Sequence, residues 1–157
     1  MLRIPRIYLE TTIFNFPFAD DAPQYKADTL KLFAEIKAGK FMPFTSEYVK
    51  SELDGTKDTD KQAKMKAMIS EYGITTIPIC EETEKLAAIY VAEGIVPKKF
   101  ETDALHIASA TVAGMDIIVS LNFKHIVKYR TIIQVEAINA QQFKVTSRIT
   151  RTARIIR

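Results

Sequence analysis

Hydrophobic and polar residues follow two alternating patterns along the chain. Short β-prone runs are separated by longer stretches in which hydrophobic residues recur at helical spacing. The β-prone runs are RIYL (6–9), FMPFT (41–45), ITTIPI (74–79) and DIIVSL (116–121). The helical stretches lie at 24–38, 46–53, 57–68 with a continuation toward residue 73, 81–94 and 102–113. Strands that alternate with helices predict an α/β fold with a mainly parallel central sheet flanked by helices.

The residues at the ends of the helical stretches support these boundaries. Ser46 and Thr102 are candidate N-caps, because a hydroxyl oxygen accepts a hydrogen bond from a backbone N–H of the first turn. Glycine commonly follows the last turn of a helix. The glycines at predicted helix ends are Gly39, Gly73, Gly94 and Gly114. Within 24–38, helical spacing directs Leu30, Phe33 and Ile36 toward the core.

The remaining segments of the sequence and its total length are consistent with a single domain. DIIVSL is continuously apolar, as is typical of a strand that is buried on both faces. IVPKKF (95–100) is expected to be a loop, and further strands are expected at TIIQVEAI (131–138) and FKVTS (143–147). A length of 157 residues suits one domain with a sizeable core. We therefore expect one domain over residues 1–147, followed by a basic tail over 148–157.

Composition narrows the class of protein. Hydrophobic residues make up 47% of the chain and charged residues 26%, as in ordinary globular proteins. The single cysteine, Cys80, cannot form an internal disulfide and lies outside any Cys/His metal-binding spacing, which favours the cytoplasm. Glu10 interrupts the first apolar run, and no uncharged run approaches the length of a membrane span. We expect neither a signal peptide nor a membrane segment.

The net charge of +3 is unevenly distributed. The segment RITRTARIIR (148–157) holds four arginines and no acid, so residues 1–147 carry a net charge of −1. The body is nearly neutral and the tail is basic. Two interpretations of the tail remain open: a solvated terminus, and an electrostatic contact with nucleic acid.

Polar residues follow two of the predicted strands. Glu10 and Thr11 come directly after RIYL, and Ser120 and Asn122 come at the end of the apolar run that begins at residue 116. The functional crevice of an open parallel sheet lies beyond the carboxyl ends of its strands. These residues are therefore expected to lie together at that edge.

Two acids from predicted helices can join this edge. Glu52 lies in the helix that follows the second strand, and Asp103 lies in the first turn of the helix over 102–113. With Glu10 and Asn122 they would form an oxygen-rich cluster. Carboxylates without basic partners repel one another, and a hard cation such as Mg²⁺ or Mn²⁺ relieves that repulsion. Such an ion could activate water and stabilise the charge that develops on a phosphodiester during hydrolysis.

Each candidate also has an ordinary structural interpretation. Asp103 interacts favourably with the helix dipole at the start of a helix. Glu10 and Asn122 can be turn residues, and Glu52 can be a solvated surface acid.

Two histidines lie close to these candidates in the sequence. His106 is one turn after Asp103 and is weighed as a hydrogen-bonded core residue. His125 is three residues after Asn122, is expected to be more exposed, and is a candidate contact for RNA or phosphate. Other catalytic motifs are missing from the sequence, including GxGxxG, GxxxxGK[ST] and GxSxG.

The order of these motifs resembles the PIN-domain family, small metal-dependent nucleases that include the VapC-type toxins of bacterial and archaeal toxin–antitoxin pairs. The resemblance spans about residues 6 to 145. YLETTIFN, with Glu10 and Thr11, is similar to the opening strand and its acid, and SEYVKSEL, with Glu52, to the helix of the second acid.

The two later motifs are the more specific ones. TDALHIASA places Asp103 at the start of an alanine-rich helix, as the family does. IIVSLNFKHI resembles the strand and polar turn that ordinarily carry the last acid. Here Asn122 stands at that position, with Ser120 two residues before it.

The resemblance implies an endoribonuclease that depends on Mg²⁺ or Mn²⁺. The implied catalytic and metal-binding residues are Glu10, Glu52, Asp103 and Asn122. Thr11 and Ser120 are expected to orient these groups or the substrate. The resemblance also implies a homodimer and an antitoxin protein as partner.

Two departures from the family pattern bear on activity. Family members usually carry Asp where Glu10 and Asn122 stand. A longer carboxylate shifts the metal or the backbone, and an amide removes one negative charge, which weakens cation binding. The main alternative is therefore a catalytically impaired PIN-like domain that binds RNA or protein. A metal-dependent phosphatase or DNase is a third possibility.

Overall fold

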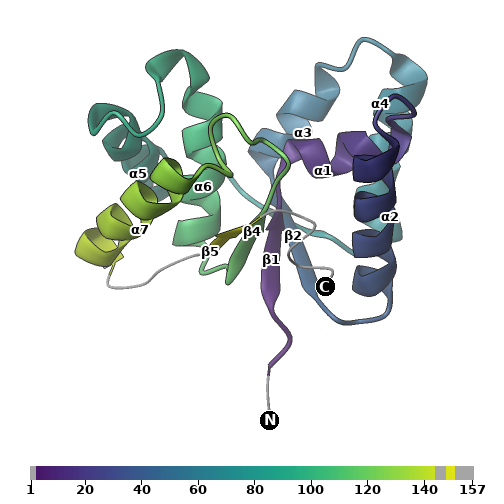
Figure 1. Ribbon diagram of the computed structural model, residues 1–157, viewed down its shortest axis with the longest axis horizontal. Coiled ribbons are helices and arrows are strands. Elements are labelled where there is room, and N and C mark those ends of the chain that lie inside the picture. The colour runs from purple at the N-terminus through teal and green to yellow at the C-terminus, as the bar shows by residue number, and fades with distance from the viewer. Residues whose placement is uncertain (1–2, 144–147, 151–157) are drawn as a thin grey trace.

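The computed structural model describes residues 3–143 and 148–150 of the chain. Its centre is a five-stranded sheet with the strand order β3-β2-β1-β4-β5, shown in Figure 1. The strands are β1 (Arg6–Leu9), β2 (Met42–Ser46), β3 (Thr75–Ile77), β4 (Ile117–Val119) and β5 (Arg148–Thr150). All neighbouring strands pair in parallel. The prediction of an α/β fold with a parallel central sheet is confirmed.

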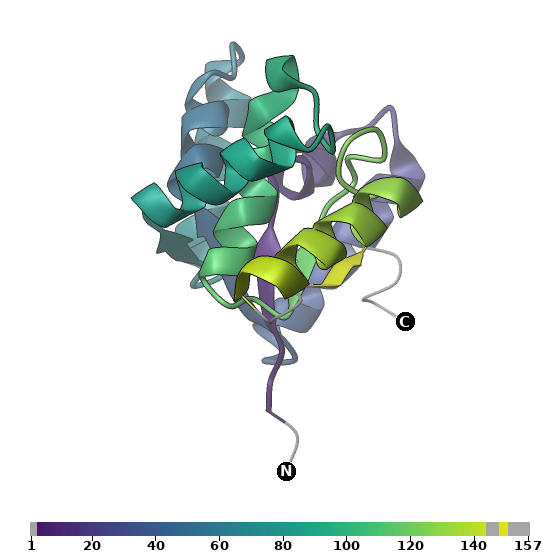
Figure 2. The same cartoon turned by 90° about the vertical axis from the view of Figure 1, so that its left-hand side faces the viewer.

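Helices cover both faces of this sheet. They are α1 (Thr11–Asn15), α2 (Pro23–Lys37), α3 (Glu47–Asp54), α4 (Thr59–Glu71), α5 (Glu81–Ala92), α6 (Glu101–Val112) and α7 (Tyr129–Phe143), with short 3₁₀ helices η1 (Phe16–Phe18) and η2 (Lys98–Phe100). In Figure 1, α5, α6 and α7 lie on one side of the sheet and α2 and α4 on the other. Figure 2 views the first of these layers face-on. Within the described ranges, no helix has both the length and the apolar character needed to cross a membrane.

The core lies against both faces of the sheet. Ile7, Tyr8 and Leu9 are fully buried, because successive side chains of β1 point to opposite, helix-covered faces. Helices α2 and α5 each bury one stripe, which includes Leu32, Phe33 and Ile36 of α2 and Leu86 and Tyr90 of α5. Helix α6 is buried over most of its surface, because residues 106–111 are all buried. The prediction for α2 was wrong at Leu30, which is 47% exposed, whereas Leu32 takes the core position.

Most helix ends lie where the sequence predicts them. The Ser46 hydroxyl accepts a hydrogen bond from the Val49 N–H at 3.3 Å, so the first predicted N-cap is confirmed. The four glycines expected at helix ends have positive φ. At Gly114, with φ +72°, this conformation allows the chain to leave α6, which ends at Val112, and enter β4, which begins at Ile117.

The second predicted N-cap was wrong. Helix α6 begins at Glu101, one residue before Thr102, and Phe100 occupies the N-cap position without a side-chain hydrogen bond. The preceding segment, expected to be a loop, contains η2, which runs directly into α6. Asp103 is therefore the third helical residue, and its carboxylate still lies in the first turn.

The region after residue 130 differs most from its prediction. Residues 131–138 form part of α7, so the strand predicted there was wrong. Thr131, Val135 and Asn139 are buried at a spacing of four residues, which is a helical stripe, whereas the β-branched composition had favoured a strand. A short apolar run does not distinguish these structures without knowledge of what it packs against.

The end of the sheet also lies beyond the expected domain boundary. Of the strand predicted at 143–147, Phe143 ends α7 and residues 144–147 lie outside the described residues. Strand β5 pairs with β4 through residues 148–150, so the sheet extends past residue 147. The remainder of the basic tail, residues 151–157, lies outside the described residues.

Candidate functional site

The candidate residues come together beyond the carboxyl ends of the strands. Glu10 directly follows β1, and the segment with Ser120 and Asn122 directly follows β4. Glu52 comes from α3, which begins where β2 ends, and Asp103 comes from the first turn of α6. Because all the strands are parallel, these ends meet at one edge of the sheet, at the top in Figure 1.

Glu10 is buried and tied to the segment after β4. Its Oε1 accepts hydrogen bonds from the Ser120 hydroxyl at 2.7 Å, from the Thr12 hydroxyl at 2.6 Å and from the Thr12 N–H at 3.3 Å. Burial raises the pKa of Glu10, although the nearby charge of His106 and these hydrogen bonds act in the opposite direction. The carboxylate is therefore held in place by donors that also make its ionised form tolerable.

Thr12 belongs to the polar residues that follow β1, but the sequence assigned it no role in the site. Its hydroxyl donates to Glu10 and accepts the Leu121 N–H at 2.9 Å, so it joins the start of α1 to the chain beyond β4. The only signal in the sequence was its place two residues after a candidate acid. Its role depends on a contact across 109 residues, which no local pattern encodes.

Asn122 connects Ser120 to Asp103. The Asn122 N–H donates to the Ser120 hydroxyl at 2.9 Å, and its Nδ2 donates to Asp103 Oδ1 at 3.1 Å. Its Oδ1 accepts the His125 N–H at 3.0 Å. Both ends of the Asn122 amide are thus engaged, and the side chain meets Asp103 as a donor, which a carboxylate at this position could not do without a proton.

Asp103 also pairs with His125. The distance from His125 Nδ1 to Asp103 Oδ2 is 2.9 Å. Burial raises the pKa of Asp103, and the charge of Glu52 raises it further, whereas His106, His125 and the hydrogen bond from Asn122 lower it. As expected, His125 is more exposed than His106. Its ring nevertheless has two partners, because Nδ1 pairs with Asp103 and the ring centroid lies 4.1 Å from that of Phe100.

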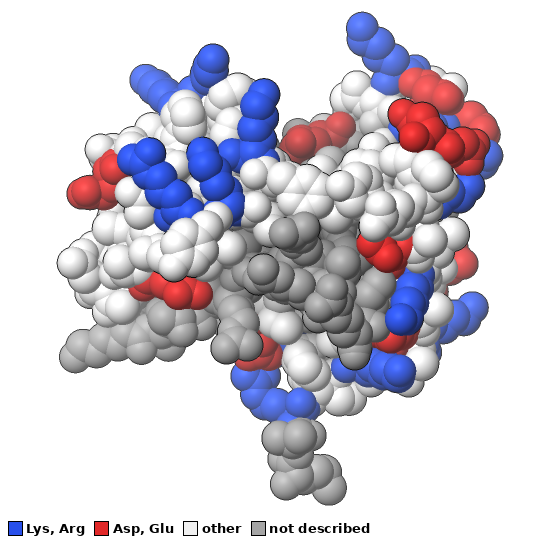
Figure 3. Space-filling model, in the orientation of Figure 1, with Lys and Arg blue, Asp and Glu red and all other residues white. Residues whose placement is uncertain are grey.

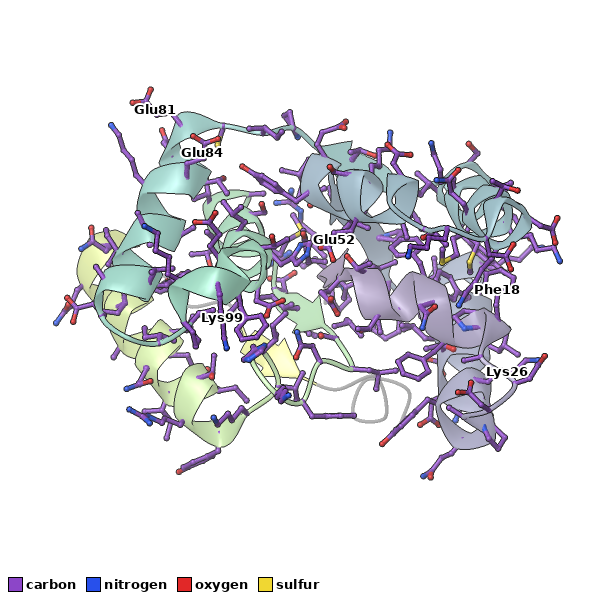
Figure 4. All side chains as sticks on the ribbon, turned by 90° about the horizontal axis from the view of Figure 1, so that it is seen from above. Phe18, Lys26, Glu52, Glu81, Glu84 and Lys99 are labelled. Carbon is purple, nitrogen blue, oxygen red and sulfur yellow. The ribbon has the colours of Figure 1, made fainter. Side chains whose placement is uncertain are left out.

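Glu52 is held by two donors from different elements. Its Oε1 accepts a hydrogen bond from the Thr11 hydroxyl at 3.0 Å and is hydrogen-bonded to Nε2 of His106. Burial alone would raise the pKa of Glu52, but the hydrogen bond and charge of His106, with the Thr11 hydroxyl, lower it below its ordinary value. In Figure 4, Glu52 lies near the centre of the molecule, between the two groups of helices.

His106 lies fully buried among the three acids. Its Nδ1 is 2.8 Å from the Tyr8 hydroxyl, which is 2.7 Å from the Ser46 hydroxyl. Burial lowers the pKa of His106, but Glu52, Glu10 and Asp103 together raise it above its ordinary value. The histidine is a hydrogen-bonded core residue, and it also supplies the basic group that faces the acidic cluster.

In this arrangement the acids form a hydrogen-bonded network and not a ligand sphere. Among the described residues, no group of three or more His, Cys, Asp and Glu side chains could hold a metal ion. The donor set nevertheless has the chemistry of a hard-cation site, since it consists of carboxylate and amide oxygens. The hydrogen bonds to Glu10 and Glu52 use Oε1 of each side chain. Both carboxylate oxygens of Asp103 and the amide oxygen of Asn122 are engaged, by contrast. A cation would therefore require Asp103 and Asn122 to share or exchange their present partners.

Comparison with solved structures gives a likeness in fold. The fold is similar to a chain in the crystal structure of VapBC2 from Rickettsia felis bound to a DNA fragment from their promoter, with a TM-score of 0.58. The similarity covers 93% of this chain and 98% of the other at 14% sequence identity. No family model and no curated protein matches the chain. At this identity the likeness establishes the fold alone.

Proposed function

We propose that this chain is a PIN-type, metal-dependent endoribonuclease that hydrolyses RNA phosphodiester bonds and acts as the toxin of a toxin–antitoxin pair. One observation carries the proposal. Glu10, Glu52 and Asp103, which come from distant segments, surround a single buried histidine at the carboxyl edge of the sheet. Burial raises the pKa of Glu10 and Asp103, so their ionised forms are costly in this site, and a divalent cation, which favours the ionised carboxylate, would offset that cost.

Mg²⁺ or Mn²⁺ would be held by carboxylate oxygens of Glu10, Glu52 and Asp103 and by the amide oxygen of Asn122. A bound ion of this kind supplies an activated water and stabilises negative charge on the phosphate. Hydroxyl groups of the protein hold two of these carboxylates in position through hydrogen bonds. Ser120 holds the carboxylate of Glu10, and Thr11 holds that of Glu52. These two hydroxyls act on the acids, which is one of the two roles expected for them.

The proposal extends to partners and location. Because the similar solved structure is a VapBC2 assembly, we include an antitoxin protein as the partner of this chain. A homodimer and a cytoplasmic location follow from the same toxin assignment. RNA is the proposed substrate.

A second candidate function is a catalytically impaired PIN-like domain that binds RNA or protein. The specific observation in its favour is that every acid of the cluster already has donors within the protein, and that Asn122 donates to Asp103 where a further carboxylate would repel it. Such a network is stable without a cation.

The deciding experiment measures cleavage and metal binding side by side. Purified protein is incubated with several unrelated single-stranded RNAs in Mn²⁺, in Mg²⁺ and in EDTA, and Mn²⁺ binding is measured by titration calorimetry. We expect metal-dependent cleavage that Asp103→Asn and Glu52→Gln abolish. Glu84→Gln, an exposed acid at the outer edge of the molecule in Figure 4, is the matched control and should cleave as the unmodified protein does.

The outcomes separate the two candidates. Absence of cleavage on all RNAs together with absence of Mn²⁺ binding would favour the impaired domain and overturn the nuclease proposal. Cleavage that survives Asp103→Asn and Glu52→Gln would place the activity elsewhere. Several RNAs are needed because a selective enzyme leaves most sequences intact.

A further inference from the structure

Basic side chains form a second charged group beside the acidic cluster. Lys98 and Lys99 lie in η2, Lys124 and Lys128 lie in the segment between β4 and α7, and Arg130 lies in the first turn of α7. All five are exposed. We call these five residues the basic rim. Figure 3 shows basic side chains gathered on one lobe beside the hollow at the top of the molecule, with acidic side chains within that hollow.

The charges of the basic rim have no ion-pair partner within residues 3–143 and 148–150. Lysines elsewhere, such as Lys26, Lys64 and Lys85, form ion pairs with nearby carboxylates. In the part of the chain that the structure describes, no ion pair involves a member of the basic rim. The segment 122–130 contains no acid at all. Since residues 1–147 carry a net charge of only −1, the rim is a local excess of positive charge and a candidate contact for an external anion.

The basic rim is physically joined to the candidate site. Lys99 Nζ lies 5.1 Å from the centre of the Phe100 ring. The Phe100 ring is tilted by 31° against the His125 ring at 4.1 Å, and His125 pairs with Asp103. A short series of contacts thus leads from an exposed lysine to a carboxylate of the acidic cluster. In Figure 4, which views the molecule from above, Glu52 lies near the centre and Lys99 lies to its lower left.

Exposed aromatic residues are neighbours of the rim cations in the sequence. Tyr129, between Lys128 and Arg130, is 80% exposed. Phe123, beside Lys124, is 36% exposed, and its ring lies 5.7 Å from that of Tyr25. Surfaces that bind single-stranded nucleic acid combine cations, which contact phosphates, with aromatic faces, on which bases stack. An acidic protein segment would use the cations but gain little from an exposed aromatic ring between them.

We propose that the basic rim binds the phosphate backbone of single-stranded RNA and leads the strand toward the acidic cluster, with a base stacked on Tyr129. This inference rests on the proposed function, because it assigns a substrate-binding surface to the same site. Binding and cleavage remain separately measurable, since phosphate contacts by Lys and Arg require no divalent ion.

The test measures binding without cleavage. Full-length protein in EDTA is titrated into a fluorescein-labelled 20-nucleotide single-stranded RNA, and anisotropy is recorded at several salt concentrations. The rim variants are the double charge reversals Lys98→Glu/Lys99→Glu and Lys124→Glu/Lys128→Glu. The matched control is Lys31→Glu/Lys37→Glu, two exposed lysines of α2 on the other side of the sheet. The arginines of residues 151–157 are present in every variant, so their contribution is constant.

We expect each rim variant to bind at least about tenfold more weakly than the unmodified protein. Loss of two phosphate contacts should also reduce the slope of log K against log salt by about 1.4, at about 0.7 per phosphate. Tyr129→Ala should weaken binding about tenfold, because it removes a stacking face, with little change in the salt slope. The α2 control should bind nearly as the unmodified protein does, and circular dichroism should verify that all variants are folded.

Three results would overturn the inference. The first is equal weakening by the rim and α2 variants, because binding would then follow net charge alone. The second is unchanged RNA binding in the rim variants. The third is competition by poly-glutamate as effective as competition by unlabelled RNA, together with no effect of Tyr129→Ala, which would assign the surface to acidic protein. RNA binding through the rim, together with no cleavage of any tested RNA and no Mn²⁺ binding, would instead overturn the proposed function and leave the rim assignment standing.

Discussion

Nε2 of the buried His106 is hydrogen-bonded to the carboxylate of Glu52, 54 residues earlier in the chain. Because the pKa of Glu52 is lowered, its carboxylate is the acceptor and Nε2–H is the donor. The other ring nitrogen contacts Tyr8, whose hydroxyl contacts Ser46. A continuous hydrogen-bonded series therefore runs from the core of the sheet to an acid of the candidate site, and it determines how stability responds to pH and to mutation.

The stability of the protein should fall between pH 6 and pH 9. His106 has a raised pKa, so its contribution is complete below its ordinary pKa of about 6.5 and is lost as pH rises through the higher folded value. Glu10 and Asp103 also have raised pKa values, so their contributions decline as pH rises too, but this decline begins at their ordinary values of 4.5 and 3.8, below the range that His106 covers. Glu52 has a lowered pKa and loses its contribution only as pH falls toward and through that lowered value.

Urea denaturation at pH 6 and pH 9 measures this dependence. We expect a lower free energy of unfolding at pH 9 for the unmodified protein and a smaller difference for His106→Gln, which lacks the titrating group. Identical pH dependence in the two proteins would show that His106 does not exchange a proton with this network in that range.

Tyr8→Phe should destabilise the fold by about 1–3 kcal/mol. The substitution removes a fully buried hydroxyl and leaves the Ser46 hydroxyl and Nδ1 of His106 without their partner. Tyr48→Phe is the matched control, because the buried Tyr48 hydroxyl has no hydrogen-bond partner among the described residues. Its removal should be neutral or slightly stabilising. Equal unfolding free energies for the two variants would argue against the series through Tyr8.

Asn139→Ala should destabilise the protein by about 1–3 kcal/mol. The Tyr90 hydroxyl donates to the amide oxygen of Asn139, and the amide nitrogen donates to the Thr111 hydroxyl at 3.2 Å, so this side chain joins α7 to α5 and α6. Burial raises the pKa of Tyr90 to about 12, which keeps the phenol a donor. The exposed Gln141→Ala on the same helix should change stability by less than about 0.5 kcal/mol. Similar midpoints for both variants in chemical denaturation would contradict this role.

Asn122→Asp should make the protein less stable without metal and more responsive to Mn²⁺. The new carboxylate would face Asp103 and lose the Nδ2 donor, which adds repulsion to the acidic cluster. The same charge should strengthen cation binding by about tenfold, since affinity rises with ligand charge. Thermal unfolding with and without Mn²⁺ measures both effects. Gln141→Glu adds the same charge at an exposed position of α7 and should show neither.

The sequence by itself determined the features that depend on local pattern. Alternating β-prone and helical stretches led to the parallel sheet, and glycines marked the ends of four helices. Because parallel strands share one carboxyl edge, the positions of Glu10 and Asn122 at strand ends were enough to predict that they meet there. Each of these inferences follows from spacing over a few residues.

Tertiary structure decided what depends on contacts between distant segments. Residues 131–138 became a helix because one stripe packs against the body, which their β-branched composition does not reveal. His106 became the buried base among the acids, and Thr12 a bridge between strand ends, through contacts across 54 and 109 residues. The physical reason is that burial and hydrogen-bond partners belong to the three-dimensional neighbourhood of a residue, whereas its sequence neighbours restrict only the local backbone.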